Sequence, residues 1–175
     1  YFALDVTNPT AATLLDGTLG FAEANASQLV KFDRTRGTSE PAPNCGAMTG
    51  TEKTNCLKVV EEDKDIGYII AKPVRDDNDA MRSTQIARMN NNRWAVVLGN
   101  GYNSTNQRPV LLVQYLDGAK ELLRIPVTTE TAGIGNATDN GLAAPRVVDI
   151  NGDGRTDVVY AGDNRGNLWK FDLTS

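Results

Sequence analysis

The sequence predicts an all-β fold made of four-stranded antiparallel units. Three observations support this prediction: short runs rich in β-branched residues, turns rich in glycine and asparagine between them, and an internal repeat of this order. The chain has 175 residues, of which 40% are hydrophobic and 16 are glycine, which is enough for one domain with a hydrophobic core. From Gln85 onward no segment of ten or more residues has helical periodicity.

The first strand is expected in YFALDVT, where Phe2, Leu4 and Val6 alternate with smaller or polar residues before an Asn-Pro turn. The next segment, TLLDGTLGFAEA, is compatible with either a strand or a short helix, and QLVKFDRTRG predicts a further strand. No run approaches the ~20 apolar residues of a membrane helix, so no membrane-spanning segment is expected. No charged leader precedes Tyr1, and we expect processing or a boundary upstream.

A long loop insertion is expected from about Gly37 to Asp65, where the composition becomes polar. Cys45 and Cys56 lie within it, eleven residues apart. Two thiols alone cannot form a structural zinc site, so a local disulfide made in an oxidising compartment is favoured. Closing so short a loop would stabilise the fold by about 3 kcal/mol in the chain-entropy model. Two unpaired surface thiols in a cytosolic protein are the alternative.

Two acidic clusters are expected to be solvated surface. The first is EEDKD, from Glu61 to Asp65, and the second contains Asp76, Asp77 and Asp79 in what we interpret as an exposed loop. A second metal site at either cluster is the alternative. No glycine turn and no alternate-residue spacing of ligands favours it.

The internal repeat begins after Gln85. Four strands are expected there within about 42 residues, in the runs IARM, WAVVLG, VLLVQYLD and ELLRIPV. The C-terminal runs VVDI, DVVYAG and LWKFDL repeat the first three, with NGDGRT where the first unit has NNNR. Such repeats are typical of β-propeller blades. We therefore expect part of a propeller. The end of one blade is expected at about residues 1–19, an insertion at 20–65, one full blade at 66–127 and an incomplete blade at 143–175.

The strongest chemical motif is the nine-residue segment from Asp149 to Asp157. Oxygen-bearing side chains stand at its first, third, fifth and ninth positions, in Asp149, Asn151, Asp153 and Asp157. This is the ligand spacing of a calcium loop, in which Gly154 at position six permits the sharp turn. The seventh residue, Arg155, would contribute its backbone carbonyl.

Two other interpretations of this segment fit the residues less well. Tyr160 stands where an EF-hand needs a bidentate glutamate, and the runs VVDI and DVVY on either side are typical of strands, so the segment is not an EF-hand. Asp, Asn and Gly also form plain hairpin turns without a metal. Such a turn needs no carboxylate at position nine, which favours the metal site.

Composition excludes several classes of function. The net charge of −4 argues against a nucleic-acid-binding surface, which needs clustered Lys and Arg. The chain has no histidine, which removes the commonest general base, the usual catalytic triads and any zinc site that contains histidine. A non-enzymatic function is therefore expected, and the acidic surface suits a divalent cation.

Several motifs resemble the C-terminal propeller of the PilC/PilY family of type IV pilus tip proteins: YFALDVTNP, DIGY, RWAVVLGNGYNS and APRVVDINGDGRTDVVYAGDNRGNLWKFDL. The resemblance implies a quinoprotein-like propeller at the pilus tip or outer surface, reached through the periplasm. It also implies adhesion, a role in pilus biogenesis and calcium-dependent control of pilus extension and retraction in twitching motility. The family's calcium loop falls on Asp149, Asn151, Asp153, Arg155 and Asp157.

The partners that this resemblance implies are minor pilins or other pilus components, and a host or abiotic surface. Residues from about Gly20 to Lys64 depart from the family pattern. A quinone-cofactor dehydrogenase propeller is an alternative that also uses calcium, but this chain has only Trp94 and Trp169 and no adjacent cysteines. A calcium propeller of the integrin type would repeat the nine-residue loop, of which one copy is visible.

Overall fold

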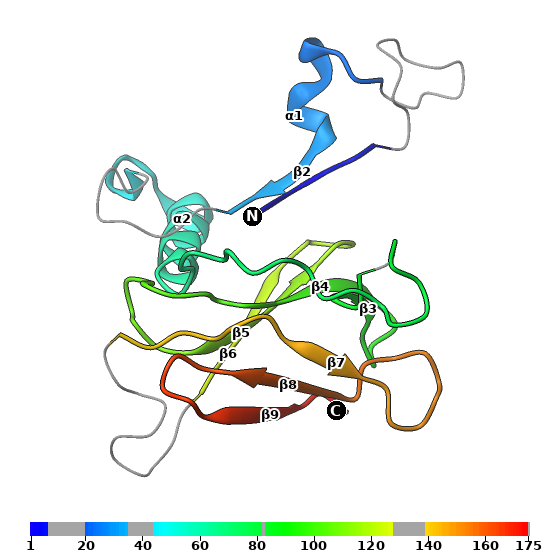
Figure 1. Cartoon of the computed structure of the whole chain (residues 1–175). Coiled ribbons are helices and arrows are strands. Elements are labelled where there is room, and N and C mark those ends of the chain that lie inside the picture. Colours follow the sequence, from blue (N-terminus) through cyan, green and yellow to red (C-terminus); the bar gives the residue numbers. More distant parts are fainter. Residues whose placement is uncertain (7–19, 35–43, 82, 128–138, 175) are drawn as a thin grey trace. The chain divides into compact units, whose positions relative to one another are not determined.

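Two compact units, Tyr1–Thr35 and Arg36–Ser175, make up the computed structural model (Figure 1). The structure describes residues 1–6, 20–34, 44–81, 83–127 and 139–174. Its strands form antiparallel sheets, so the all-β prediction is confirmed. In the described ranges no helix combines the length and the apolar character needed to cross a membrane.

The first unit contains a two-stranded antiparallel sheet of β1 (Phe2–Leu4) and β2 (Val30–Asp33). Both strands agree with the sequence prediction. A short 3-10 helix, η1 (Glu23–Asn25), and helix α1 (Ala26–Leu29) precede β2. Of the described residues of the segment TLLDGTLGFAEA, Glu23 and Ala24 begin the 3-10 helix, and residues 20–22 lie in no helix or strand. The remainder of that segment up to residue 19 lies outside the described residues.

The second unit contains a four-stranded antiparallel sheet in the order β3-β4-β5-β6. Its strands are β3 (Ile86–Arg88), β4 (Trp94–Gly99), β5 (Val110–Tyr115) and β6 (Leu122–Pro126). Every residue of β5 is buried, which explains why its sequence, VLLVQY, is apolar except for Gln114 and does not alternate. The four strands expected in this stretch are confirmed.

A three-stranded antiparallel sheet in the order β7-β8-β9 follows in the same unit. Its strands are β7 (Arg146–Val148), β8 (Val158–Gly162) and β9 (Leu168–Asp172). Their order repeats that of β3, β4 and β5, as the sequence repeat predicts. The blade boundaries given above stay predictions, and residues 7–19 of the first expected blade lie outside the described residues.

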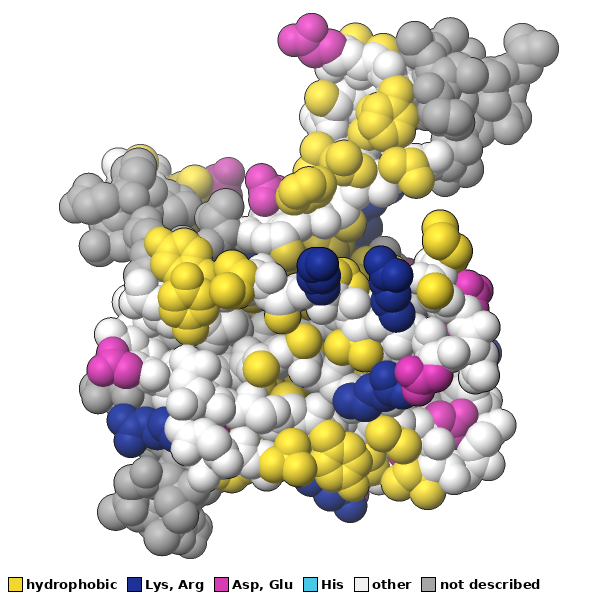
Figure 2. Space-filling view, viewed as in Figure 1, with side chains coloured by type: hydrophobic (Ala, Val, Ile, Leu, Met, Phe, Trp, Pro, Cys, Tyr) yellow, Lys and Arg dark blue, Asp and Glu magenta, His cyan; other side chains and the backbone are white. Residues whose placement is uncertain are grey.

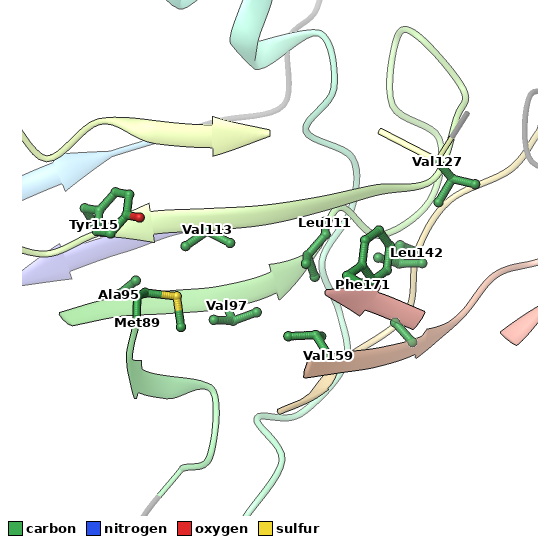
Figure 3. Packing of buried hydrophobic residues seen from close by; sticks show 11 residues of the cluster. Met89, Ala95, Val97, Leu111, Val113, Tyr115, Val127, Leu142, Val159 and Phe171 are labelled. Carbon is green, nitrogen blue, oxygen red and sulfur yellow. The ribbon is translucent and has the colours of Figure 1, made fainter. Parts of the chain in front are cut away.

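The hydrophobic core of the second unit is built from both of its sheets (Figure 3). Val97 and Leu111 come from the four-stranded sheet, Val159 and Phe171 from the three-stranded sheet, and the first three are fully buried. Burying one such aliphatic side chain contributes roughly 1.5–3 kcal/mol. The shared core fixes the two sheets against each other, and with them the loop between β7 and β8.

Backbone contacts also join the two sheets. The Gly101 amide, just after β4, donates to the Leu142 carbonyl at 2.9 Å, and the next residue, Ala143, is held to β8 by a bond from its amide to the Gly162 carbonyl at 2.9 Å. A Cβ atom at Gly141 would overlap the carbonyl oxygen of Gly101, so only glycine allows this close approach. The segment that leads into β7 is thereby held against the end of β4.

The expectation of a long loop insertion is wrong for Gly50–Asp63, which form the 14-residue helix α2. Most of its side chains are exposed, including Leu57 and Val59, so no continuous apolar stripe marks the helix in the sequence. The favourable helix propensities of Glu, Lys and Leu stabilise it locally. Polar composition here therefore reflects an exposed helix.

The structure contains the disulfide that the spacing of the two cysteines predicts. It joins Cys45, in the 3-10 helix η2 (Cys45–Ala47), to Cys56 in α2, with a Cα–Cα distance of 5.7 Å. Cys45 is buried. The bond therefore ties the helix to the segment before it, and the alternative of two unpaired thiols does not hold.

Several large apolar side chains are exposed on the strands of the second unit. Ile86, Trp94 and Leu168 are 48%, 46% and 73% exposed. Figure 2 shows that apolar side chains on the visible face form separate groups, with positive and negative charges between them. Separate exposed apolar side chains of this kind are common on protein surfaces.

Candidate metal centre

The motif from Asp149 to Asp157 connects β7 to β8. The two strands pair so that Val148 lies opposite Val158, which brings the two ends of the loop together. Gly152 and Gly154 have φ angles of 79° and 82°, in the left-handed region that favours glycine. The sequence prediction of a tight loop between two strands is therefore confirmed.

Asp149, the first loop residue, closes the loop through its carboxylate. Its two oxygens accept hydrogen bonds from the amides of Gly152 and Gly154, both at 2.7 Å. The Gly154 amide is the main reason why the pKa of Asp149 is lowered, since these bonds favour the ionised carboxylate. The loop is thus curled around an ionised first residue.

The third and fifth loop residues each cap the backbone two residues further on. Asn151 Oδ1 accepts from the Asp153 amide at 2.9 Å, and Asp153 Oδ1 accepts from the Arg155 amide at 2.9 Å. The second oxygen of Asp153 pairs with Arg155 Nη1 at 3.2 Å. In the described part of the chain, Arg155 Nε is the one buried side-chain nitrogen or oxygen that lacks a hydrogen-bond partner.

Asp157, the ninth residue, belongs to both the loop and the sheet. Its side chain is buried, and Oδ2 accepts from the Ile150 amide at 2.9 Å. Its own amide donates to the Val148 carbonyl at 3.0 Å, and its carbonyl accepts from the Leu173 amide at 2.8 Å. Asp157 therefore differs from the other acidic residues of the loop in being buried and in having its backbone bonded within the sheet.

The chemistry of this donor set fits calcium. Three carboxylates, an amide oxygen and the Arg155 carbonyl are hard oxygen donors, and an oxygen that accepts one amide hydrogen retains a second lone pair. In this structure the three carboxylates of the loop do not converge on one point. Across the described residues, no three Asp, Glu or Cys side chains are grouped closely enough to hold a metal ion. Asp153 is instead paired with Arg155, and Asp157 with backbone. Calcium binding at this loop therefore stays a prediction.

Asp65 is a fully buried carboxylate that the sequence interpretation missed. Arg108 binds both of its oxygens at 2.9 Å, Arg124 donates at 2.7 Å and Asn106 at 2.8 Å. Burial raises the pKa of Asp65, but the bonds from Arg108 and Asn106 outweigh this effect, so the pKa is lowered overall. These four residues, the Asp65 cluster, join the segment after α2 to the four-stranded sheet.

The expectation of a solvated face is therefore wrong for part of EEDKD, since Glu62 and Asp65 are both buried. The partners of Asp65, Arg108 and Arg124, are distant in the sequence, and no local sequence pattern indicates that they pair with it. In the second acidic segment Asp77 and Asp79 are exposed, as expected, whereas Asp76 is half-buried. Asp77 pairs with Arg146 at 2.6 Å.

A further acidic residue, Asp163, organises the turn between β8 and β9. Its carboxylate accepts from the Asn167 and Asn140 side chains and from Trp169 Nε1, at 2.9, 3.1 and 2.9 Å. Burial opposes ionisation, but these hydrogen bonds outweigh it and lower its pKa to about 2. The residue has a structural role that its position in an ordinary-looking DNRG turn does not reveal.

Comparison with known proteins gives a consistent result. A family model described as the PilY1 beta-propeller domain matches residues 77–175. The type IV pilus biogenesis factors PilY1 of two Pseudomonas aeruginosa strains, PAO1 and PAK, are 40% identical over 114 residues, which is 65% of this chain and 8% of theirs. A PilY1 homolog from Xylella fastidiosa is 37% identical over 118 residues, which is 65% of this chain and 7% of its own.

A solved structure is also similar to this chain. The crystal structure of the Pseudomonas aeruginosa PilY1 C-terminal domain matches with 39% sequence identity and a TM-score of 0.50, over 65% of this chain and 20% of that one. The chain therefore spans less than a tenth of the curated relatives it matches and a fifth of the solved domain. The family-model match and this structural match together confirm the predicted propeller fold.

Proposed function

Because the chain belongs to the PilY1 β-propeller family, we propose that it is a calcium-binding, non-enzymatic part of a type IV pilus biogenesis factor. Its relatives are named as biogenesis factors of this pilus, which supports the role in pilus assembly. None of those names describes an enzyme, so the quinone-cofactor dehydrogenase alternative gains no support. The surface of the pilus or of the cell is the corresponding location.

The observation on which the calcium assignment rests is the curled loop between β7 and β8. Oxygen donors recur at alternate positions, and Asp149 holds the amides of Gly152 and Gly154 at 2.7 Å. This arrangement turns the loop at the glycine where a calcium loop turns. A plain hairpin turn would not need the buried carboxylate of Asp157 at its ninth position.

A bound calcium ion would offset two of the three negative charges of Asp149, Asp153 and Asp157. The loop would also lose local flexibility. Its exposed residues, which cap neighbouring backbone amides in this structure, would be held in one arrangement by the ion. Any partner that binds the ordered loop would then bind more tightly as calcium rises, by mass action. Regulation of pilus extension and retraction, and attachment to surfaces, would follow from such calcium-dependent contacts with minor pilins or other pilus components.

Isothermal titration calorimetry tests the assignment on the full chain. Asp153→Ala removes one carboxylate from the loop without touching the buried sheet, and we expect calcium affinity to fall at least about tenfold, as for the loss of a charged ligand. Asp79→Ala is the matched control, since it removes an exposed carboxylate that lies outside the loop and caps the Met81 amide. Equal calcium affinity in the parent and Asp153→Ala would show that the loop is not the calcium site.

A further inference from the structure

We propose that Asn90 positions the ninth loop residue, Asp157, and thereby transmits the occupancy of the calcium loop to the neighbouring four-stranded sheet. This inference rests on the calcium binding proposed above. Asn90 lies in the turn between β3 and β4, in the sheet that does not contain the loop, and motif spacing gave it no role.

The turn itself fixes where Asn90 lies. The Met89 amide donates to the Arg93 carbonyl and the Asn92 amide to the Met89 carbonyl, both at 2.9 Å. Asn92 has a φ of 65°, a left-handed conformation that asparagine tolerates better than most residues. Asn90 is half-buried at the start of this closed turn, so its side chain has little freedom to move away.

The Asn90 side chain donates across to the other sheet. Its Nδ2 lies 2.9 Å from the Thr156 carbonyl oxygen and 2.9 Å from the Leu173 carbonyl oxygen, and 3.4 Å from Asp157 Oδ1. A primary amide has two hydrogens to donate, so both are accounted for by the two shorter contacts. The longer contact places the amide dipole beside the carboxylate of the ninth loop residue.

The two carbonyls that Asn90 binds belong to the segments that hold Asp157 in place. Thr156 precedes Asp157 in the chain, and the Leu173 amide donates to the Asp157 carbonyl at 2.8 Å. One amide group therefore joins the start of β8 and the end of β9 at the residue where they meet. A main-chain bond from the Thr156 amide to the Arg88 carbonyl, at 2.8 Å, adds a second link between the sheets.

A cation in the loop would act on this junction through Asp157. Its carboxylate oxygens face the Ile150 amide and the Asn90 amide, so any movement toward a cation changes the position of residues 156 and 157. Because Asn90 is bonded to the same residues, the change reaches the β3–β4 turn. Coupling between two sites is reciprocal, so fixing Asp157 through Asn90 also favours calcium binding.

Two variants of the same turn separate this role from a general effect on folding. Asn90→Ala removes the amide that crosses to the loop. Asn91→Ala is the matched control, because the Asn91 amide donates to the Tyr115 hydroxyl at 2.9 Å and its oxygen accepts from the Arg93 amide, both within the four-stranded sheet. Thermal unfolding without calcium checks that both variants fold. If Asn90→Ala does not fold, Asn90→Ser, which keeps one hydrogen-bond donor, takes its place.

Hydrogen exchange and calorimetry on the full chain, with and without calcium chloride, give the two readouts. In the parent we expect calcium to slow amide exchange at residues 149–157 and also at residues 88–96. In Asn90→Ala the protection at residues 88–96 should disappear, and calcium affinity should fall about two- to tenfold, because the two lost hydrogen bonds position Asp157 but do not themselves bind the ion. Asn91→Ala should keep the calcium effect on both segments.

The outcomes distinguish this inference from the proposal on which it rests. A parent chain that does not bind calcium overturns the proposed function itself. A parent that binds calcium but gains protection only at residues 149–157 overturns the role of Asn90 alone. The same conclusion follows if Asn90→Ala retains calcium-dependent protection at residues 88–96.

Discussion

Two acidic regions of the second unit hold their carboxylates in different ways. The Asp65 carboxylate is fully buried and is bound by the guanidinium of Arg124 in β6 and by the guanidinium of Arg108 and the amide of Asn106 in the loop between β4 and β5. The loop from Asp149 to Asp157 has three carboxylates that are bound mainly by backbone amides, with a single ion pair between Asp153 and Arg155.

This difference indicates where a cation can act. A buried carboxylate that is already paired by the protein is a structural anchor, and a cation would have to displace both arginines. Backbone amides orient a carboxylate without neutralising it, so the loop keeps most of its negative charge and gains from a divalent ion. The contrast predicts that stability depends on the Asp65 cluster and calcium response on the loop.

The largest effect is expected for Asp65→Asn. Breaking a buried ion pair by removing one partner costs roughly 3–5 kcal/mol, and Arg108 and Arg124 would both lose a charged acceptor. Urea unfolding should show this loss of stability equally with and without calcium. Asp79→Asn, an exposed control, should leave stability unchanged. An Asp65→Asn variant as stable as the parent would contradict the anchoring role. A loss of stability seen only without calcium would mean that the Asp65 cluster and the loop do not have separate roles.

A smaller effect is expected when Cys45 and Cys56 are both replaced by serine. The chain-entropy model gives up to about 3 kcal/mol for a disulfide that closes a short loop. Since α2 leads directly into Asp65, combining these changes with Asp65→Asn in a double-mutant cycle measures whether the two anchors cooperate. Strictly additive losses in urea unfolding would show that the disulfide and the Asp65 cluster act independently.

The pH dependence of stability provides a third test, at Asp163. Its pKa falls from the ordinary aspartate value of 3.8 to about 2 in the folded chain. Its contribution to stability is therefore complete above about pH 4 and is lost as the pH falls toward 2. In Asp163→Asn the decline in stability across this range should involve about one proton fewer. An identical pH profile in parent and variant would show that its hydrogen bonds do not favour the ionised form.

The smallest effect is expected for Arg155→Gln. The variant keeps the backbone carbonyl of the seventh loop position and removes the guanidinium that pairs with Asp153 at 3.2 Å. Exposed pairs are worth roughly 0.2–1 kcal/mol, so calcium affinity should rise by up to about fivefold. Calorimetry measures the change. Weaker calcium binding in the variant would mean that Arg155 supports the site and does not compete with the ion.

Elements with a local signal were predictable from the sequence. Strands β4 and β5 are marked by runs of Val and Leu between Gly- and Asn-rich turns, and the loop by its acidic spacing. Helix α2 was missed because it is largely exposed and lacks an apolar stripe, so its pattern is that of a polar loop. Periodicity detects burial, and this helix buries little.

The candidate site was predictable only in its own segment. The spacing identified Asp149 and Asp157, but the contacts of Asn90 with Thr156 and Leu173 join positions 66 and 83 residues away. The pairing of Asp65 with Arg108 and Arg124 likewise spans 43 and 59 residues. Such contacts depend on how the two sheets pack, and no local pattern of residue types encodes that.

Nuclear magnetic resonance of the 15N-labelled chain during a calcium titration tests the central claim most directly. The amides of Gly152 and Gly154 both donate to Asp149, so they report on the loop itself. We predict saturable shifts of these two resonances, larger than those of amides around the Asp65 cluster. Unchanged Gly152 and Gly154 resonances at saturating calcium would contradict the assignment of this loop as the calcium site.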